Sequence, residues 1–242
     1  HPAINGLPAG WTLNTTGFTL ILAQLEQTPL YNAYNFSQAS SRSAWYPGIS
    51  YIIAGNPEAN TTVTSSLISV FTCPSDKQAD LYTNAPTSND AYSANQARRS
   101  NYFMMAGQWT DYFCPAYAPH GTNPPNPGMF YPDVSFNLGA VKDGTSNTIM
   151  LSESRQEKTS ASFGPFWGVG CHTSTNGTTY YDTSIDYHSR FMPNAAWFDG
   201  SPNPRKLQYA WGTGSLHPGG TNMTMGDGSV RYIKDSINLY TW

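Results

Sequence analysis

Two residues near the C-terminus, His217 and Asp227, have side chains that could do chemistry. An imidazole and a carboxylate can serve as general bases, general acids or metal ligands. Their surroundings do not indicate nucleophilic catalysis, because the chain has no G-x-S-x-G sequence and no cysteine in a recognisable protease context. His217 precedes Pro218-Gly219-Gly220, where the chain must bend and a ring nitrogen can bond loop backbone. We therefore interpret His217 and Asp227 as structural residues and expect no enzymatic activity.

A short loop near the middle of the chain offers oxygen ligands. Asp143, Thr145, Ser146 and Asn147 follow one another closely, and Ca²⁺ prefers oxygen atoms of carboxylates, amides and carbonyls. Calcium at Asp143, Thr145 and Asn147 is therefore the best cofactor hypothesis, although the spacing is not that of an EF-hand. The alternative, which we favour, is an Asx-type turn capped by the Ser and Thr side chains, with no cofactor.

Cysteines and asparagines suggest two kinds of covalent modification. Cys73, Cys114 and Cys171 show no C-x-x-C spacing, which argues against a structural zinc site. In an exported protein two of them could form a disulfide. All three pairings remain open, and we favour Cys114–Cys171 because both residues lie in loop-rich sequence. Among the N-x-S/T triplets, the loop positions Asn60 and Asn176 are the expected glycosylation sites.

The elements that must position these residues begin with helices. Phe18, Ile21, Leu22 and Leu25 have the spacing of a helix that buries one face. Thr28 and Pro29 then predict the N-cap and first position of a second helix, which reaches about Asn35. A third short helix is predicted over Thr61–Val70, with Val63, Leu67 and Val70 on one side.

Strands follow the helices and are separated by long irregular stretches. We predict strands over Ser100–Ala106, Thr148–Ser152 and Phe163–His172. The irregular stretches are 76–99, 107–136 and 173–205. This order predicts a single α+β domain over residues 1–242, with a helix packed on an antiparallel β-sheet that carries long insertions.

A hairpin closes the predicted sheet. Asn222–Met225 and Ser229–Ile233 have strand character, and Gly226-Asp227-Gly228 between them is a turn sequence. Gly228 can take a positive φ without steric cost. From the alternation of side chains along a strand, we expect four buried residues: Met223, Met225, Val230 and Tyr232.

Four stretches together resemble one protein family. His217, nine further residues and then Asp227-Gly228 form an H-X9-DG pattern, which resembles the C-terminal signature of the prepilin-type H-X9-DG proteins (domain of unknown function 1559). The other three stretches occur in the order that the family pattern has: Leu25–Ala33; Phe71–Asp76, with Cys73, Pro74 and Asp76; and Val141–Thr148, with Asp143 and Gly144. The resemblance implies a pilin-like or pseudopilin-like exported protein, and it brings no catalytic residue.

The same resemblance implies that the precursor has a membrane anchor. Precursors of this family begin with a short basic leader and a long apolar helix, and neither is present in this sequence. We therefore expect a precursor that is anchored in the membrane by an N-terminal helix absent from this chain. The mature protein is expected outside the cell or on its surface.

Composition narrows the choice of partners. The net charge is −3, which argues against nucleic acid, because phosphate binding needs a basic surface. Arg98-Arg99 is a local basic pair, and we interpret it as a solvated corner. Charged residues make up 11% of the chain, against about 25% in an average soluble domain. A surface solubilised by hydroxyl and amide groups, with few lysines, is common in exported proteins and in tightly packed assemblies.

Two functions are compatible with these features. The first is a non-enzymatic structural subunit that forms a fibre with copies of itself or joins other subunits of the cell envelope. The second is an extracellular module that binds carbohydrate or another solute through loops that carry tryptophan. Those tryptophans are Trp11, Trp45, Trp109, Trp167, Trp197 and Trp211.

Overall fold

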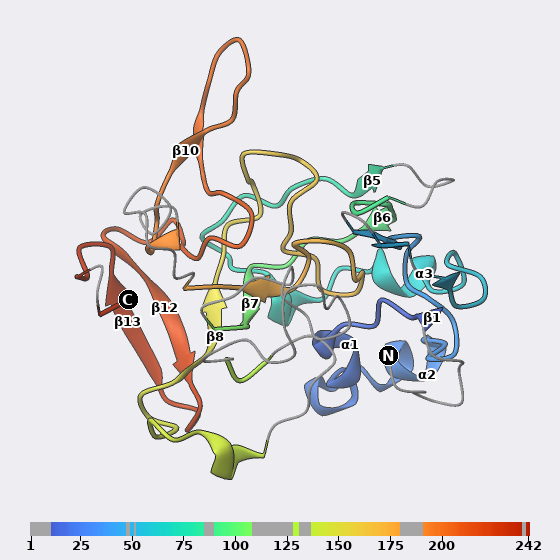
Figure 1. The fold of residues 1–242 in the computed structure, drawn as a ribbon, viewed down its shortest axis with the longest axis horizontal. Helices are drawn as coiled ribbons and strands as arrows, with labels where there is room; N and C mark the ends of the chain where they lie inside the picture. Colours follow the sequence, from blue (N-terminus) through green and yellow to red (C-terminus); the bar gives the residue numbers. More distant parts are fainter. Residues whose placement is uncertain are drawn as a thin grey trace.

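A mostly antiparallel sheet forms the centre of the protein. The computed structural model describes residues 11–46, 49–50, 52–84, 90–107, 128–130, 137–179, 191–238 and 241–242. Within these residues the largest sheet has five strands in the order β13-β12-β8-β7-β9 (Figure 1). Its strands are Tyr102–Met105 (β7), Ile149–Glu153 (β8), Asn176–Gly177 (β9), Gly220–Met225 (β12) and Val230–Lys234 (β13). All pairings are antiparallel except β7 with β9.

The remaining described elements are short. The helical ones are Gly17–Leu20 (α1), Ala23–Leu25 (η1), Thr28–Ala33 (α2), Thr61–Thr64 (α3), Ser69–Phe71 (η2) and Leu138–Ala140 (η5). The extended ones are Trp11–Thr12 (β1), Trp45–Tyr46 (β2), Ile49–Ser50 (β3), Ile52–Ile53 (β4), Tyr82–Asn84 (β5), Ala94–Ala97 (β6), Trp197–Phe198 (β10) and Lys206–Leu207 (β11). Few helices with mixed and antiparallel sheets agree with the expected α+β class. In the described part of the chain, no helix has the length and apolar composition needed to cross a membrane.

The register of the sheet separates its two faces. Residues directly opposite each other on neighbouring strands lie on the same face. Phe103, Ser152 and Met223 are aligned across β7, β8 and β12 and therefore share one face. Met104 and Glu153 lie on the other face, because side chains alternate along each strand.

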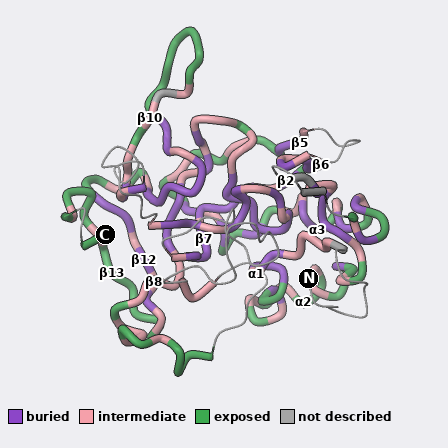
Figure 2. The backbone as a smooth tube through the Cα atoms, in the orientation of Figure 1, coloured by how far each residue is buried: buried purple, intermediate pink, exposed green. Residues whose placement is uncertain are grey.

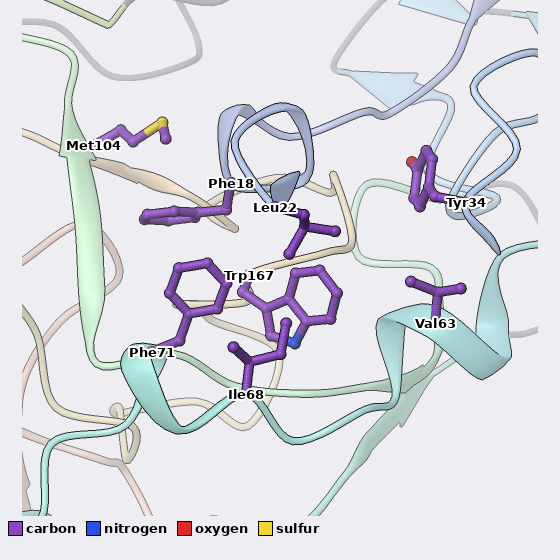
Figure 3. Packing of buried hydrophobic residues seen from close by; sticks show 8 residues of the cluster. All are labelled: Phe18, Leu22, Tyr34, Val63, Ile68, Phe71, Met104 and Trp167. Carbon is purple, nitrogen blue, oxygen red and sulfur yellow. The ribbon is translucent and has the colours of Figure 1, made fainter. Parts of the chain in front are cut away.

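The face with Met104 packs against the N-terminal segments. Phe18 and Leu22, from α1 and the turn after it, meet Ile68 and Phe71 from around η2, and the Trp167 ring lies between them (Figure 3). The centres of the Phe71 and Trp167 rings are 5.7 Å apart. The segment that carries Lys158 crosses the opposite face, since its amine lies 5.0 Å from the centre of the Phe103 ring.

Both early helices are shorter than their sequence patterns predict. Phe18 and Leu22 are buried as expected, but α1 ends at Leu20 and continues as a turn and η1. Glu26 then takes the left-handed conformation, with φ of 60°, which ends the helical path before α2. The N-cap of α2 is Gln27, one residue earlier than predicted.

The predicted helix over Thr61–Val70 is wrong in its second half. It is helical only as α3, and the chain turns again at η2. Leu67 and Val70 are exposed, whereas Ile68 and Phe71 are buried. The break rotates the apolar face, so that the residues next to the predicted ones enter the core.

The C-terminal hairpin forms at the predicted place, but two of its four expected core residues are exposed. Met223 and Met225 are buried, whereas Val230 and Tyr232 are 66% and 46% exposed. The turn has three residues between the paired Met225 and Ser229, so Met223 lies opposite Arg231 rather than Tyr232. Val230 and Tyr232 therefore lie on the other face of the edge strand, which is exposed along most of its length (Figure 2).

Two further expectations differ from the structure. The stretch 76–99 contains β5 and β6, which pair with each other, so it is not irregular throughout. Phe163–His172 is not a strand. Phe166 forms one bridge with Arg99, and Phe166, Trp167 and Val169 are buried in irregular backbone. Of the predicted insertions, most of 107–136 and the middle of 173–205 lie outside the described residues.

Candidate functional site

Three side chains from distant parts of the chain meet beside the end of β8. Cys73 follows η2, Glu153 is the last residue of β8, and His217 lies in the loop before β12. The Cys73 thiol, a Glu153 carboxylate oxygen and a His217 ring nitrogen all lie within 4.8 Å of one another. Among the described residues, no other group of three His, Cys, Asp or Glu side chains is as closely placed. The fold thus joins two motif residues, Cys73 and His217, through an acid that the motifs do not include.

Strand β12 holds the carboxylate of Glu153 in place. Glu153 Oε2 accepts hydrogen bonds from the Asn222 backbone N–H at 2.7 Å and from the Thr221 hydroxyl at 3.2 Å. Oε1 accepts from Asn222 Nδ2 at 3.1 Å and lies 3.4 Å from His217 Nε2. Glu153 is 7% exposed, so these contacts replace most of its hydration. A buried carboxylate oriented in this way can pair with an imidazolium or ligate a cation.

Tyr102 lies close to the same group. Burial raises the pKa of Tyr102, and the negative charges of Cys73 and Glu153 raise it further. Tyr102 stands directly opposite Glu153 in the pairing of β7 with β8. Tyr102 therefore lies on the same face of the sheet as Glu153. Its hydroxyl stays protonated at neutral pH.

Asn101 links the Cys73 turn to the sheet. The turn is closed by a bond from Asp76 N–H to Cys73 O. Asn101 Oδ1 accepts from Cys73 N–H at 2.9 Å and from Gln156 Nε2 at 2.8 Å. Asn101 Nδ2 donates to Asp76 Oδ2 at 2.7 Å and to Ser154 O at 3.1 Å. The Asn101 amide thus bonds both to the Cys73–Asp76 turn and to the segment after β8, and it holds the backbone of Cys73 in position.

The other motif residues form turns. Asp227 Oδ1 accepts from Ser229 N–H at 2.9 Å and from Ser229 Oγ at 2.7 Å, and these bonds lower the pKa of Asp227. Gly228 has φ of 83°. The preceding motif loop packs against this turn, because Asp227 N–H donates to Thr145 O and Gly226 N–H to Thr148 O.

The expected calcium ligands form a loop that is closed by its own hydrogen bonds. Asn147 Nδ2 donates to Asp143 O at 3.0 Å, and the Thr148 hydroxyl donates to Gly144 O at 3.2 Å. The Asp143 side chain is exposed and contributes no described contact to the loop. These bonds close the loop through Asn147 and Thr148 rather than through the Asp143, Thr145 or Ser146 side chains. Both the Asx-type turn and calcium at Asp143, Thr145 and Asn147 stay predictions.

The structure describes only some of the residues expected to carry a disulfide or a sugar. Cys114 lies outside the described residues, so its pairing with Cys171 stays a prediction; no disulfide joins two described residues. Glycosylation of Asn60 conflicts with the fold. Its amide is fully buried, accepts from Asn35 N–H, and donates to Asn35 O and Gln38 O, which leaves no room for a sugar. Asn176 is partly exposed in β9 and remains a predicted site.

Two basic residues lie inside the protein. Arg99 is not a solvated corner: it is 6% exposed, its guanidinium donates to Ala161 O and Phe163 O, and it lies 4.8 Å from the centre of the Phe166 ring. Burial lowers the pKa of Arg99 to about 10. Lys158 Nζ donates to Ser154 Oγ, Gln208 Oε1 and Gly212 O.

Arg99 and Lys158 form part of a cleft of about 320 Å³ that also contains Lys77, Tyr82 and Arg205. The cleft is open. Arg205 pairs with Asp199 and Glu157, and Arg99 and Lys158 donate to oxygen atoms of the protein. The expected solute site on tryptophan-bearing loops loses two of its residues, because Trp167 and Trp211 are buried. Trp109 lies outside the described residues, and the side chains of Trp11 and Trp45 are not described.

Sequence reasoning identified Cys73, Asp76 and His217 as motif residues but missed Glu153, Asn101 and Lys158. A signal for Glu153 existed, since it is an acid directly after the apolar run Thr148–Ser152. The signal for Asn101 was weaker, because a polar residue at the start of a strand has many explanations. Only the pairing of β8 with β7 and with β12 shows which groups these side chains meet.

The fold and the site define an α+β protein in which three of the four motif stretches surround one sheet and its C-terminal hairpin. A family model described as a protein of unknown function (DUF1559) matches residues 1–240. The chain belongs to this family, as its four motifs implied. No curated protein and no solved structure matches the chain.

Proposed function

We propose that the chain is a non-enzymatic, pilin-like subunit of an exported assembly at the cell surface. In this proposal it associates with further copies of itself, or with related envelope subunits, through the outer edge of β13. Membership of the family supports the pilin-like class. The observation that carries the proposal is the last strand of the sheet, whose apolar side chains Val230 and Tyr232 are exposed side by side.

The hydrogen-bonding groups of β13 point outward at known positions. Met225 N–H donates to Ser229 O, and Asp235 N–H donates to Gly219 O. Because every second pair of an antiparallel ladder is hydrogen-bonded, the N–H groups of Val230, Tyr232 and Lys234 point away from β12. A strand added at this edge would find three donors in register. Unpaired edge strands are the usual place for such addition.

Apolar surface next to the edge supports the same contact. The Tyr232 hydroxyl donates to Pro218 O, so the loop before β12 lies beside the edge strand. Leu216 of that loop is also exposed. Exposed apolar area at Val230, Tyr232 and Leu216 would be removed from water by an added subunit that covers them.

The test is the molar mass of the purified chain by light scattering over a wide range of concentrations. We expect mass to rise with concentration. Val230→Pro should prevent this, because it removes an outward N–H at the first position of the strand, where proline is tolerated. Val230→Thr keeps the N–H and the branched side chain and separates strand pairing from apolar contact.

Each variant decides one part of the proposal. Loss of association with Val230→Pro alone indicates strand addition, and loss with both variants indicates the apolar face. Arg231→Pro removes an N–H that is bonded within the hairpin and should instead lower the melting temperature. A wild-type protein that stays monomeric, or a Val230→Pro variant that associates like wild type, overturns the proposal.

A further inference from the structure

Cys73, Glu153 and His217 combine three kinds of ligand atom around one point. A thiolate sulfur, an imidazole nitrogen and a carboxylate oxygen are the three protein ligands that zinc takes, whereas calcium and magnesium take oxygen alone. The absence of C-x-x-C pairs excludes only cysteine-rich zinc sites. From this geometry we propose that the protein binds one Zn²⁺ ion through Cys73 Sγ, Glu153 Oε1 and His217 Nε2.

The distances are close to those that zinc needs. With bond lengths of about 2.0–2.3 Å, tetrahedral ligands lie roughly 3.3–3.7 Å apart. His217 Nε2 and Glu153 Oε1 are already 3.4 Å apart. The largest separation in the group is within 4.8 Å, so a shift of about 1 Å at the sulfur completes the set. Cys73 and His217 both lie outside the strands of the sheet, so the shift needs no change in strand pairing.

Contacts behind each ligand hold it in place, as around known metal sites. Glu153 is oriented by Thr221 and Asn222. The backbone N–H of His217 donates to Ser215 Oγ at 3.1 Å. Cys73 is positioned through its N–H by Asn101.

Packing does not explain the position of the Cys73 thiol. Cys73 is 7% exposed but belongs to none of the described apolar clusters. Its sulfur instead lies beside a carboxylate and an imidazole. A buried thiol in a structural role would normally be surrounded by apolar groups, so this placement favours a ligand.

The proposed site is open on one side. The His217 side chain is 31% exposed, whereas that of Glu153 is 8% exposed. Water can therefore take the fourth position from the side of the His217 loop. Bound zinc would tie the Cys73 turn and the His217 loop to the end of β8, and so brace the start of the C-terminal hairpin.

The experiment is a titration of the reduced, chelator-treated chain with Zn²⁺ and, separately, with Co²⁺. We expect one equivalent of zinc to bind and to raise the melting temperature. Cobalt should give a near-ultraviolet thiolate charge-transfer band. Cys73→Ser should abolish the band and weaken zinc binding by about a hundredfold or more, because even residues behind a ligand contribute about 10–100-fold.

Two controls keep the result interpretable. Cys171→Ser and His172→Gln replace the other described cysteine and a histidine outside the group, and both should bind zinc like wild type. His217→Gln leaves the buried Glu153 with its β12 contacts and tests a second ligand if Cys73→Ser folds poorly. Absence of zinc binding by wild type reduces the group to a Glu153–His217 ion pair and overturns the proposal. Equal binding and an equal cobalt band in Cys73→Ser overturn it as well.

Discussion

At the scale of single residues, Lys158 has a charged type of side chain that is buried. Its amine lies within hydrogen-bonding distance of Ser154 Oγ, Gln208 Oε1 and Gly212 O and faces the ring of Phe103. Burial lowers the pKa of Lys158 well below its usual value of 10.5, and the positive charges of Arg99 and Arg155 lower it further. No carboxylate bonds to the amine among the described contacts, so protonation is costly in the folded state.

This predicts a stability that increases with pH above neutrality. Between the lowered pKa of Lys158 and 10.5, the unfolded chain binds more protons than the folded one, so the free energy of unfolding rises with pH. Denaturant unfolding from about pH 7.5 to about pH 9.5 should show this rise, and Lys158→Met should flatten it. In the same range the raised pKa values of Tyr34, Tyr82 and Tyr102 contribute little, because these groups stay protonated.

Lys234→Met is the matched control, since it removes an exposed lysine of β13. Its stability should follow the wild-type dependence on pH. The readout is the slope, because Lys158→Met also removes the polar contacts of the amine and changes stability at every pH. Parallel curves for wild type and Lys158→Met would contradict the assignment.

At the scale of elements, the C-terminal hairpin shows what local sequence can predict. The turn residues were identified correctly, because Gly228 supplies the positive φ that ends a three-residue hairpin loop. The buried face of β13 was not, because burying Val230 and Tyr232 beside Met225 and Met223 requires a register in which these residues are opposite each other. The three-residue loop instead places Thr224 opposite Val230 and Met223 opposite Arg231, and this one-residue shift of register moves Val230 and Tyr232 to the opposite face.

The helices show a second limit of local sequence. The spacing of Phe18, Leu22 and Leu25 correctly predicted the buried side, but the left-handed Glu26 interrupts the helix. Irregular segments such as 163–172 carry buried aromatic residues with no period at all. Their positions are set by contacts with distant strands, and a single sequence gives no sign of these contacts.

Gly228 provides a test of the hairpin turn. A Cβ atom at this position would meet nothing within 4 Å, so Gly228→Ala adds backbone strain without a clash. We expect it to lower the free energy of unfolding by about 1–2 kcal/mol. Gly228→Asn should cost less, because asparagine tolerates the left-handed region. Urea denaturation measures both, and equal stability of wild type and Gly228→Ala would show that the turn takes another conformation.

At the scale of the whole molecule, the proposed zinc site and the edge strand are both attached to β12. His217 lies in the loop before β12, β13 pairs with β12, and β12 also orients Glu153. The sequence motifs included His217 and Cys73, but their meeting depends on the strand order of the sheet. Strand order is a long-range property, and this is why the site could be predicted only in part.

Trp167 connects the layers of the protein. Its backbone oxygen accepts from the Thr16 hydroxyl at the start of α1, and its N–H donates to Arg98 O. The indole Nε1 donates to Ser66 O at 3.2 Å, and the ring packs between Phe71 and the α1 segment. These contacts join the N-terminal segments to the loops that cover the sheet, so loss of the ring should affect all of them.

We predicted a single domain over residues 1–242, and Trp167 offers the test. Trp167→Ala should lower the free energy of unfolding by about 3–5 kcal/mol, while far-ultraviolet and near-ultraviolet circular dichroism still report one shared transition. Trp242→Ala, at the partly exposed end of the chain, should cost much less. If the variant instead melts in two steps, the N-terminal segments and the sheet with its C-terminal hairpin are separate folding units, because only the first of them would depend on the Trp167 ring.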